Sequence, residues 1–352
     1  MIQTKEILLD PKQIDPALAD EAGAVLRRGG LVAFPTETVY GLGANALDER
    51  AVRSIFTAKG RPSDNPLIVH VAGIDDVAPL VTEIPPRARA VMERFWPGPI
   101  SIILKKSDKI GDVVSAGLDT VAVRMPSHPV ALAVIQAAGV PVAAPSANTS
   151  GKPSPTAARH VRDDMYGKID MIIDGGRCGV GVESTVLDLS GDTPAILRPG
   201  GITAQMLVPV IGPVISPAAQ VADKDTPKCP GMKYKHYAPE AQVVVLEYTG
   251  TLDHARLTAM ADSAHASGKR VGVLSCENTG NIYGVELFYY GGGDSRAYAA
   301  NLFYALRTFD EAGIDIVYCP MRLGDEMAVA VKNRLYKAAA GNVVPFDKGN
   351  GA

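Results

Sequence analysis

The sequence predicts an α/β protein with two domains. Two observations indicate this class. Short apolar segments alternate with amphipathic ones along most of the chain, and a Pro-rich stretch without periodicity, Pro209 to Thr226, separates two such alternating regions. At 352 residues the chain is long enough for two cores. Hydrophobic residues at 47% and charged residues at 21% are typical of a globular protein.

The first region begins with a helix expected over residues 17–28, which Gly29 and Gly30 end. Further helices are expected over residues 48–59, 87–95, 129–138, 157–166 and 202–208. Strands are expected over residues 31–34, 67–71, 100–105, 121–124, 140–144, 171–174, 184–189 and 195–198. This order predicts one α/β domain with a mixed sheet.

The second region repeats the alternation at smaller scale. Strands are expected over residues 243–246, 270–275, 285–290 and 315–319, and helices over 252–267, 295–312 and 325–340. Strands that alternate with helices predict a parallel, Rossmann-like α/β domain. Its GGGD segment, residues 291–294, precedes a helix and could bind an anion there, but an ordinary turn is the interpretation we favour. The domains are therefore predicted at 10–208 and 241–345, joined by a linker over 209–240.

Several classes of protein are disfavoured. The net charge of −3 argues against a protein that mainly grips a nucleic-acid backbone. The four cysteines are far apart without a CxxC pair, which argues against a zinc site and favours a reduced, cytoplasmic protein. The N-terminus MIQTKEILLD does not resemble a signal peptide, and no apolar run is long enough for a bilayer.

Common catalytic and nucleotide-binding motifs do not describe the chain. GLGANA, residues 41–46, matches a loose dinucleotide pattern but follows a polar turn, so the match is weak. The sequence contains no P-loop, no GxSxG elbow and no HExxH motif.

Polar side chains instead cluster where predicted strands and helices end. Taken singly, each has a structural explanation as a turn residue, a cap, a core histidine or a solvated cation. Their joint occurrence beside glycines predicts one pocket suited to a polyanion such as a nucleoside triphosphate. The clusters are Thr36 and Thr38; Lys59, Arg61, Ser63 and Asn65; His70; Thr120 and Arg124; Ser146, Asn148, Ser150 and Ser154; Ser184 and Thr185; and Arg198.

These clusters lie in longer motifs that resemble a known family. The motifs are PTETVYGLGANA, KGRPSDNPLIVHV, FWPGPISIIL, VAVRMPSHP, APSANTSGKPSPT, VESTVLDL and ILRPGG. Together they cover nearly all of residues 10–208 and resemble the L-threonylcarbamoyladenylate synthase family. The resemblance implies a YrdC-like fold, a twisted mixed open sheet with helices. The KYKHYAP segment and the trailing domain resemble the two-domain long form of that family.

The resemblance also implies a reaction. L-threonine and bicarbonate or CO2 give an N-carboxy-threonine, whose carbamate oxygen attacks the α-phosphate of ATP and releases pyrophosphate. Mg2+ enters with ATP, and no tightly bound organic cofactor is implied. In the family, a separate transferase complex passes the threonylcarbamoyl group to the adenosine beside the anticodon of certain tRNAs; direct tRNA contact is left open. No membrane contact is implied.

Residue roles follow from the resemblance at matching positions. Lys59 and Arg61 are the expected catalytic cations, which with Arg198 and Mg2+ hold the phosphates. L-threonine is expected to contact Thr38, His70, Arg124, Ala144 and Ser184. ATP is expected to contact Arg61, Asn65, Thr120, Ser146, Ser154, Arg198 and Tyr237. No side chain is expected to bind a metal directly.

The linker suggests a moving part. We expect residues 234–237 to fold over the nucleotide as a lid, because the carbamate and the mixed anhydride both hydrolyse readily and a lid excludes water. The second domain is expected to support this lid or to meet a partner. Two alternatives remain open at this point: an RNA-binding module, and a carbamoyl-transfer protein with a YrdC-like domain.

Overall fold

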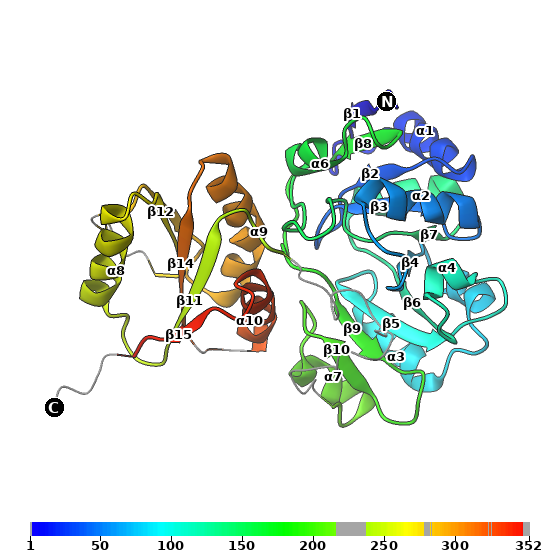
Figure 1. Ribbon diagram of the computed structural model, residues 1–352. Coiled ribbons are helices and arrows are strands. Elements are labelled where there is room, and N and C mark those ends of the chain that lie inside the picture. The colour runs from blue at the N-terminus through cyan, green and yellow to red at the C-terminus, as the bar shows by residue number, and fades with distance from the viewer. Residues whose placement is uncertain are drawn as a thin grey trace. The chain divides into compact units, whose positions relative to one another are not determined.

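The computed structural model describes residues 2–215, 237–277, 282, 284–322, 324 and 326–347 (Figure 1). The chain divides into two compact units, residues 1–150 with 154–234 and residues 151–153 with 235–352. Most of the predicted linker lies outside the described residues. The predicted boundaries at 208 and 241 therefore stay predictions.

The first unit is built on one ten-stranded mixed sheet, in the order β1-β8-β2-β3-β7-β4-β6-β5-β9-β10. Parallel pairs such as β4 with β6 occur beside antiparallel pairs such as β5 with β6, so the predicted mixed sheet is confirmed. The strands are β1 (Lys5–Leu8), β2 (Val32–Phe34), β3 (Gly41–Asn45), β4 (Ile68–His70), β5 (Ile100–Lys105), β6 (Thr120–Arg124), β7 (Val142–Ala143), β8 (Met171–Asp174), β9 (Thr185–Asp188) and β10 (Ala195–Arg198).

Local sequence signals explain where the helices begin and end. Asp48 caps α2, accepting hydrogen bonds from the amides of Arg50 and Ala51, and Gly60 ends it in the left-handed conformation at φ 60°. The last helix extends past the expected residue 208 to Ile211, with Pro209 inside it. The helices are α1 (Pro16–Arg27), α2 (Glu49–Lys59), α3 (Pro86–Phe95), α4 (Asp112–Ser115), α5 (Pro129–Ala138), α6 (Ala158–Met165) and α7 (Ala204–Ile211), with a 3₁₀ helix, Asp75–Leu80.

Two strands of this sheet escape prediction from local pattern. The GLGAN segment forms β3, where a Cβ at Gly43 would lie 2.7 Å from the Phe34 ring and 2.8 Å from a Val142 methyl group. Gly43 therefore allows close packing of β3 between β2 and β7. β1 forms only through parallel pairing with β8, more than 160 residues along the chain.

The two faces of the central strands differ. Val69, Val123 and Ile102 belong to the main apolar cluster of this unit. Residues one position away along the same strands form a separate small cluster of Ile68, Ile103, Ala122 and Val186. Because side chains alternate along a strand, the small cluster occupies the opposite face of the sheet.

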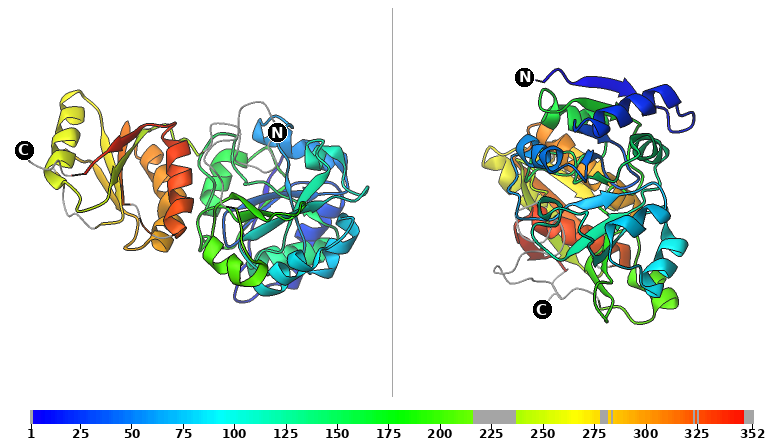
Figure 2. Two further views of the ribbon diagram at one scale, coloured as in Figure 1. Left: turned by 90° about the horizontal axis from the view of Figure 1, so that it is seen from below. Right: turned by 90° about the vertical axis from the view of Figure 1, so that its right-hand side faces the viewer.

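The second unit has a five-stranded sheet in the order β13-β12-β14-β11-β15, and every pair in it is parallel. In Figures 1 and 2, α8 lies on one face of this sheet and α9 with α10 on the other. Asp294 of the GGGD segment caps α9 by accepting a 2.7 Å bond from the amide of Ala297, which agrees with a turn. The elements are β11 (Gln242–Tyr248), α8 (His254–Ala266), β12 (Val271–Ser275), β13 (Leu287–Tyr290), α9 (Ser295–Glu311), β14 (Ile316–Arg322), α10 (Glu326–Ala338) and β15 (Val343–Pro345).

This unit has its own core, which includes Leu246, Val273 and Phe346. Within the described residues of the whole chain, none of the helices combines the length and apolar character that crossing a bilayer needs.

Candidate active site

The small apolar cluster is the floor of the candidate site, and polar residues flank it. β4 and β6 pair in parallel with His70 beside Arg124 and Ile68 beside Ala122. Alternation puts His70, Arg124 and Thr120 on the face that carries the small cluster. Thr120 begins β6 and Arg124 ends it, so they stand about 13 Å apart at a strand rise of ~3.3 Å. The expected threonine and ATP contacts therefore lie toward opposite ends of one strand.

Arg124 is the central cation at the carboxyl end of β6. It is 4% exposed, and its Nη2 donates a 2.7 Å bond to Oε1 of Glu37. Its Nε is buried and has no hydrogen-bond partner among the described residues. A buried donor without a partner is costly, so this side chain is poised to bind an anionic ligand group.

His70 lies beside Arg124 and is uncharged near neutral pH. Burial, aided by the positive charge of Arg124, lowers the pKa of His70 to about 3. Its Nδ1 is also buried without a partner in the described part of the chain. A neutral imidazole with an open ring nitrogen can form a hydrogen bond with an uncharged group such as a hydroxyl.

The turn after β2 brings Thr38 to the same region. Thr38 is fully buried, and its hydroxyl lies 2.8 Å from that of Thr36. The backbone carbonyls of Glu37 and Thr38 accept hydrogen bonds from the amides of Val180 and Gly181, at 2.7 and 3.1 Å. These contacts tie the turn to the segment before β9.

Ser184 and Arg198 form a linked pair at the next edge of the site. Arg198 is 5% exposed and donates to both the carbonyl and the hydroxyl of Ser184, at 3.0 and 3.1 Å. The Ser184 hydroxyl lies 2.8 Å from that of Ser101 on β5. Arg198 is thus buried, so the simple alternative of a surface arginine is wrong, and its expected contact with ATP stays a prediction.

A second polar group, Asn65 with Arg61, lies in the segment before the amino end of β4. Asn65 is fully buried, and neither polar atom of its side chain has a partner among the described residues. Arg61 donates a 3.0 Å bond to the Asn65 carbonyl. An open amide beside a guanidinium suits recognition of a polar, anionic ligand.

Lys59 is buried rather than solvated, with 3% of its surface exposed. Its ammonium group donates to the carbonyls of Ser146 and Asn148, the latter at 2.6 Å. Ala144 is placed by a 2.9 Å bond from its amide to the carbonyl of Ile68. Lys59 therefore holds the loop of Ala144 and Ser146 in place, and its expected contact with phosphate stays a prediction.

Comparison with known proteins identifies the family. A family model described as "Telomere recombination" matches residues 24–200, and one described as "Threonylcarbamoyl-AMP synthase, C-terminal domain" matches residues 202–340. The Threonylcarbamoyl-AMP synthase of Pyrococcus abyssi is 48% identical over 92% of this chain and 94% of its own. That of Bacillus subtilis is 47% identical over 94% of this chain and 95% of its own. This chain belongs to the threonylcarbamoyl-AMP synthase family, in its two-domain form.

The fold agrees with solved members of the family. The crystal structure of P. abyssi Sua5 complexed with L-threonine superposes with a TM-score of 0.92 at 46% identity, covering 97% of this chain and 99% of that one. The predicted YrdC-like domain with a parallel second domain is therefore confirmed. These similarities also remove the RNA-binding and carbamoyl-transfer alternatives as leading interpretations.

Two carboxylates of the site were not singled out from the sequence. Glu183 is 8% exposed, and its Oε1 accepts a 2.6 Å bond from the expected ATP ligand Ser154. Glu37 pairs with Arg124, 87 residues along the chain. Both lie inside the motifs PTET and VEST, so the signal was present, but an acidic side chain does not itself suggest a site for anions.

Tyr237 and the expected lid are only partly described. Residues 234–236 lie outside the described residues. Tyr237 belongs to the second unit, where its ring stacks on that of Phe303 with centroids 5.1 Å apart. Its place beside the nucleotide stays a prediction.

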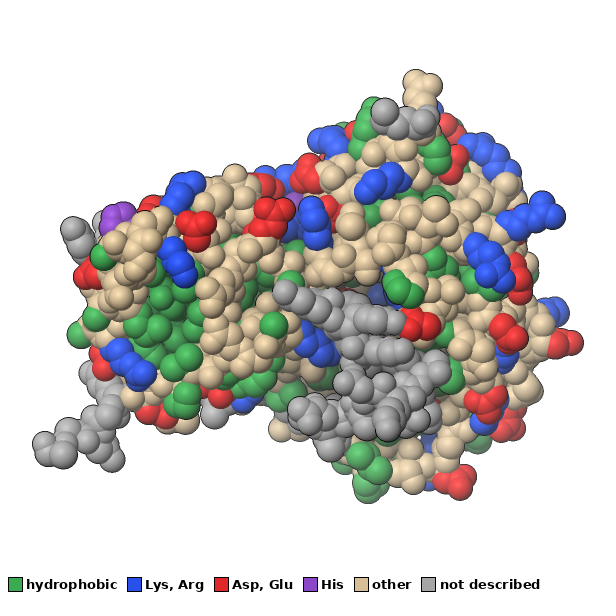
Figure 3. Space-filling model, viewed as in Figure 1, with side chains coloured by type: hydrophobic (Ala, Val, Ile, Leu, Met, Phe, Trp, Pro, Cys, Tyr) green, Lys and Arg blue, Asp and Glu red, His purple; other side chains and the backbone are tan. Residues whose placement is uncertain are grey.

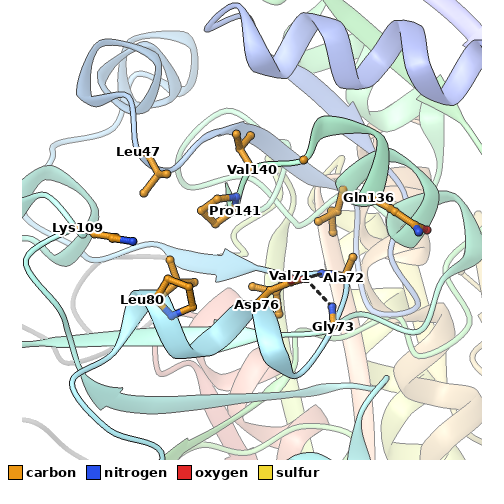
Figure 4. Close-up of a pocket in the computed structure, with 13 residues that line it drawn as sticks. Leu47, Val71, Ala72, Gly73, Asp76, Leu80, Lys109, Gln136, Val140 and Pro141 are labelled. Carbon is orange, nitrogen blue, oxygen red and sulfur yellow. Dashed lines mark hydrogen bonds between the residues drawn. The ribbon is translucent and has the colours of Figure 1, made fainter.

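A separate cleft of about 580 Å3 does not contain the predicted site residues (Figure 4). Most of its lining side chains are apolar, including Leu47, Leu80 and Pro141. Its carboxylate, Asp76, accepts hydrogen bonds from the amides of Ala72 and Gly73 and so serves a local turn. Its other long polar side chains are those of Lys109 and Gln136, and neither is a predicted site residue.

The charge on the face drawn in Figure 3 gives no reason to favour nucleic acid as the main ligand. On the face drawn in Figure 3, Lys and Arg side chains of the described residues are interspersed with Asp and Glu ones. A protein that grips a nucleic-acid backbone usually gathers its cations on one surface.

Proposed function

We propose that this protein condenses L-threonine, bicarbonate or CO2 and ATP to threonylcarbamoyl-AMP and pyrophosphate. The observation that carries the proposal is a group of buried polar atoms that have no hydrogen-bond partner among the described residues, namely Arg124 Nε and His70 Nδ1 at the ends of β6 and β4 and the Asn65 amide just before β4. A folded protein tolerates such atoms where a ligand will bind them. The named activity of its relatives supplies the identity of that ligand set.

In this proposal Arg124 binds the threonine carboxylate, because a guanidinium can hold a carboxylate with two parallel hydrogen bonds. The neutral His70 bonds the threonine hydroxyl. Thr38, Ala144 and Ser184 complete the threonine pocket. Each of these residues lies around the carboxyl ends of β4 and β6 or in the loops tied to them.

ATP contacts Arg61, Asn65, Thr120, Ser146, Ser154, Arg198 and Tyr237, and Lys59 and Arg61 act on the phosphates. Among the described residues, no group of three His, Cys, Asp or Glu side chains could hold a metal ion. In this proposal Mg2+ enters as part of the MgATP substrate, as is usual for an ion that prefers phosphate oxygens and water.

The chemistry needs alignment and charge neutralisation more than a covalent nucleophile. The threonine amine forms a bond to the carbon of bicarbonate, with loss of water, or of CO2, with loss of a proton to solvent. The resulting carbamate oxygen then attacks the α-phosphorus, and the bond to the pyrophosphate oxygen breaks. An anion thus approaches an anion, so fixed cations and pre-aligned donors supply most of the rate enhancement.

The product is a labile mixed anhydride, so a consumer must follow. In the proposal, a tRNA threonylcarbamoyl transferase complex takes it up in the cytoplasm and modifies the adenosine beside the anticodon. A lid that includes Tyr237 protects the carbamate and the anhydride from water until release.

A pyrophosphate-release assay tests the proposal. The purified chain is incubated with MgATP and bicarbonate, with and without L-threonine, and the product mass is recorded. We expect release that depends on both threonine and bicarbonate, together with the mass of threonylcarbamoyl-AMP. L-serine is the control for recognition of the methyl group. Absence of pyrophosphate release under all conditions would reject the function.

The lid is tested in the same assay with Tyr237→Ala. A higher KM for ATP is expected. An unchanged KM for ATP and an unchanged product yield would remove the lid from the proposal.

A further inference from the structure

We infer that Glu37 is a positioning residue that orients the Arg124 guanidinium for the carboxylate of the amino-acid substrate. This inference rests on the proposed function and extends it by naming a residue that acts through Arg124. It follows from one contact that joins the turn after β2 to the end of β6.

The contacts of Glu37 use both of its carboxylate oxygens. Oε1 accepts the 2.7 Å bond from Arg124 Nη2, and Oε2 accepts a 3.1 Å bond from the backbone amide of Ser127. The side chain of Glu37 is 13% exposed and that of Arg124 is 5% exposed. The pair is therefore largely withdrawn from water, where a charge-assisted hydrogen bond holds its geometry better than at the surface.

The backbone of Glu37 is held as firmly as its side chain. Its carbonyl accepts a hydrogen bond from Val180, and the hydroxyl of Thr36 bonds the carbonyl of Val39 within the same turn. A carboxylate on a fixed turn gives Arg124 a fixed partner. A long arginine side chain without such a partner would sample several rotamers and lose entropy when the substrate binds.

Charge balance also favours this role. A buried guanidinium without a counter-ion is costly, and Glu37 neutralises it while Nε keeps no partner among the described residues. Among the described residues, Glu37 accepts one hydrogen bond from Arg124, and the donor is Nη2. The substrate carboxylate then meets a guanidinium that is already desolvated and already oriented.

The test is the affinity for L-threonine, measured by calorimetry without ATP. Glu37→Gln keeps the shape of the side chain and removes its charge. We expect the Kd for L-threonine to rise about tenfold, as for the loss of coupling within a buried charged pair. The affinity for ATP is expected to stay within about twofold. Glu21→Gln is the matched control, because it removes the same charge from an exposed pair with Lys5 on the same unit.

A double-mutant cycle separates positioning from a merely structural role. In an Arg124→Gln background, Glu37→Gln should weaken L-threonine binding by less than about twofold, because its partner is already gone. An equal loss in both backgrounds would show that Glu37 does not act through Arg124. Melting temperatures identify any variant that fails to fold, in which case Glu37→Asp, with a shorter carboxylate, should show an intermediate Kd.

The outcomes distinguish the two levels of the proposal. If the unmodified protein binds L-threonine and Glu37→Gln binds it equally well, only the role of Glu37 is overturned. If the unmodified protein does not bind L-threonine at millimolar concentration, both the role and the proposed function are overturned.

Discussion

At the scale of single residues, the environment of a side chain decides its chemistry more than its type does. His70 illustrates this, because a lone histidine in an apolar strand is usually structural. Here it is 3% exposed, lies beside Arg124, and has its pKa lowered to about 3. These conditions make it a neutral hydrogen-bonding group rather than an acid or base near pH 7.

The lowered pKa of His70 predicts a pH-dependent stability. The unfolded imidazole, with an ordinary pKa near 6.5, takes up a proton as the pH falls below that value, whereas the native imidazole stays neutral down to about pH 3. The unfolded state therefore binds more protons in this window, and stability falls as the pH drops. Between pH 7.5 and 5 the loss from this group is about 2 kcal/mol.

Urea denaturation of the native protein and of His70→Asn at both pH values measures this effect. Other groups titrate in both proteins, so the difference between the two pH dependences isolates His70. We expect the variant to lose about 2 kcal/mol less than the native protein on acidification. Parallel losses in the two proteins would contradict the buried neutral imidazole.

At the scale of elements, α2 connects ordinary helix rules to the site. Asp48 caps its start and Gly60 caps its end. The last turn carries Lys59, and Arg61 follows Gly60. The capping residues are readable from the sequence because they satisfy backbone groups locally. The contacts of Lys59 with the carbonyls of Ser146 and Asn148 are not readable, because those residues lie almost 90 positions away.

Gly60 provides the prediction at this scale. A Cβ there would meet no atom of the described residues within 4 Å, so the cost of substitution comes from the left-handed backbone at φ 60°. Gly60→Val should lower the free energy of unfolding by about 1–2 kcal/mol and weaken ATP binding through the displaced Arg61. Gly60→Asn is the control, because asparagine tolerates this conformation and should cost less than half as much. Equal costs for both variants in urea denaturation would show that backbone strain is not the cause.

At the scale of the whole molecule, the two units have separate cores. Val123 belongs to the main cluster of the first unit and Leu246 to that of the second, and both are fully buried. Separate cores predict two unfolding transitions, because apolar contacts within a unit unfold together.

Matched truncations test this independence. Leu246→Ala should destabilise one transition by about 2–5 kcal/mol and leave the affinity for L-threonine unchanged. Val123→Ala should shift the other transition by a smaller amount, since fewer methyl groups are removed, and weaken threonine binding through β6. Calorimetric scans resolve the transitions, and a single transition shifted by both variants would refute independent cores.

Much of the fold follows from local sequence signals. Most of the predicted helices and strands occur within a few residues of their expected ranges, because periodicity, caps and turn residues act over short distances. β1 and β3 do not follow from such signals. β1 exists through pairing with β8, and β3 is a glycine-rich segment that becomes a strand only between β2 and β7.

The sequence by itself determined the two-domain α/β order and the family, and it predicted the residue types that meet the substrates, because motifs and short-range patterns carry that information. Only the tertiary structure decided which of those side chains stay open to a ligand. Arg124 is paired with Glu37 through one nitrogen, Lys59 is occupied by backbone carbonyls, and the Asn65 amide has no partner among the described residues. Burial and hydrogen bonding depend on strand register and on neighbours far along the chain, which local sequence does not specify.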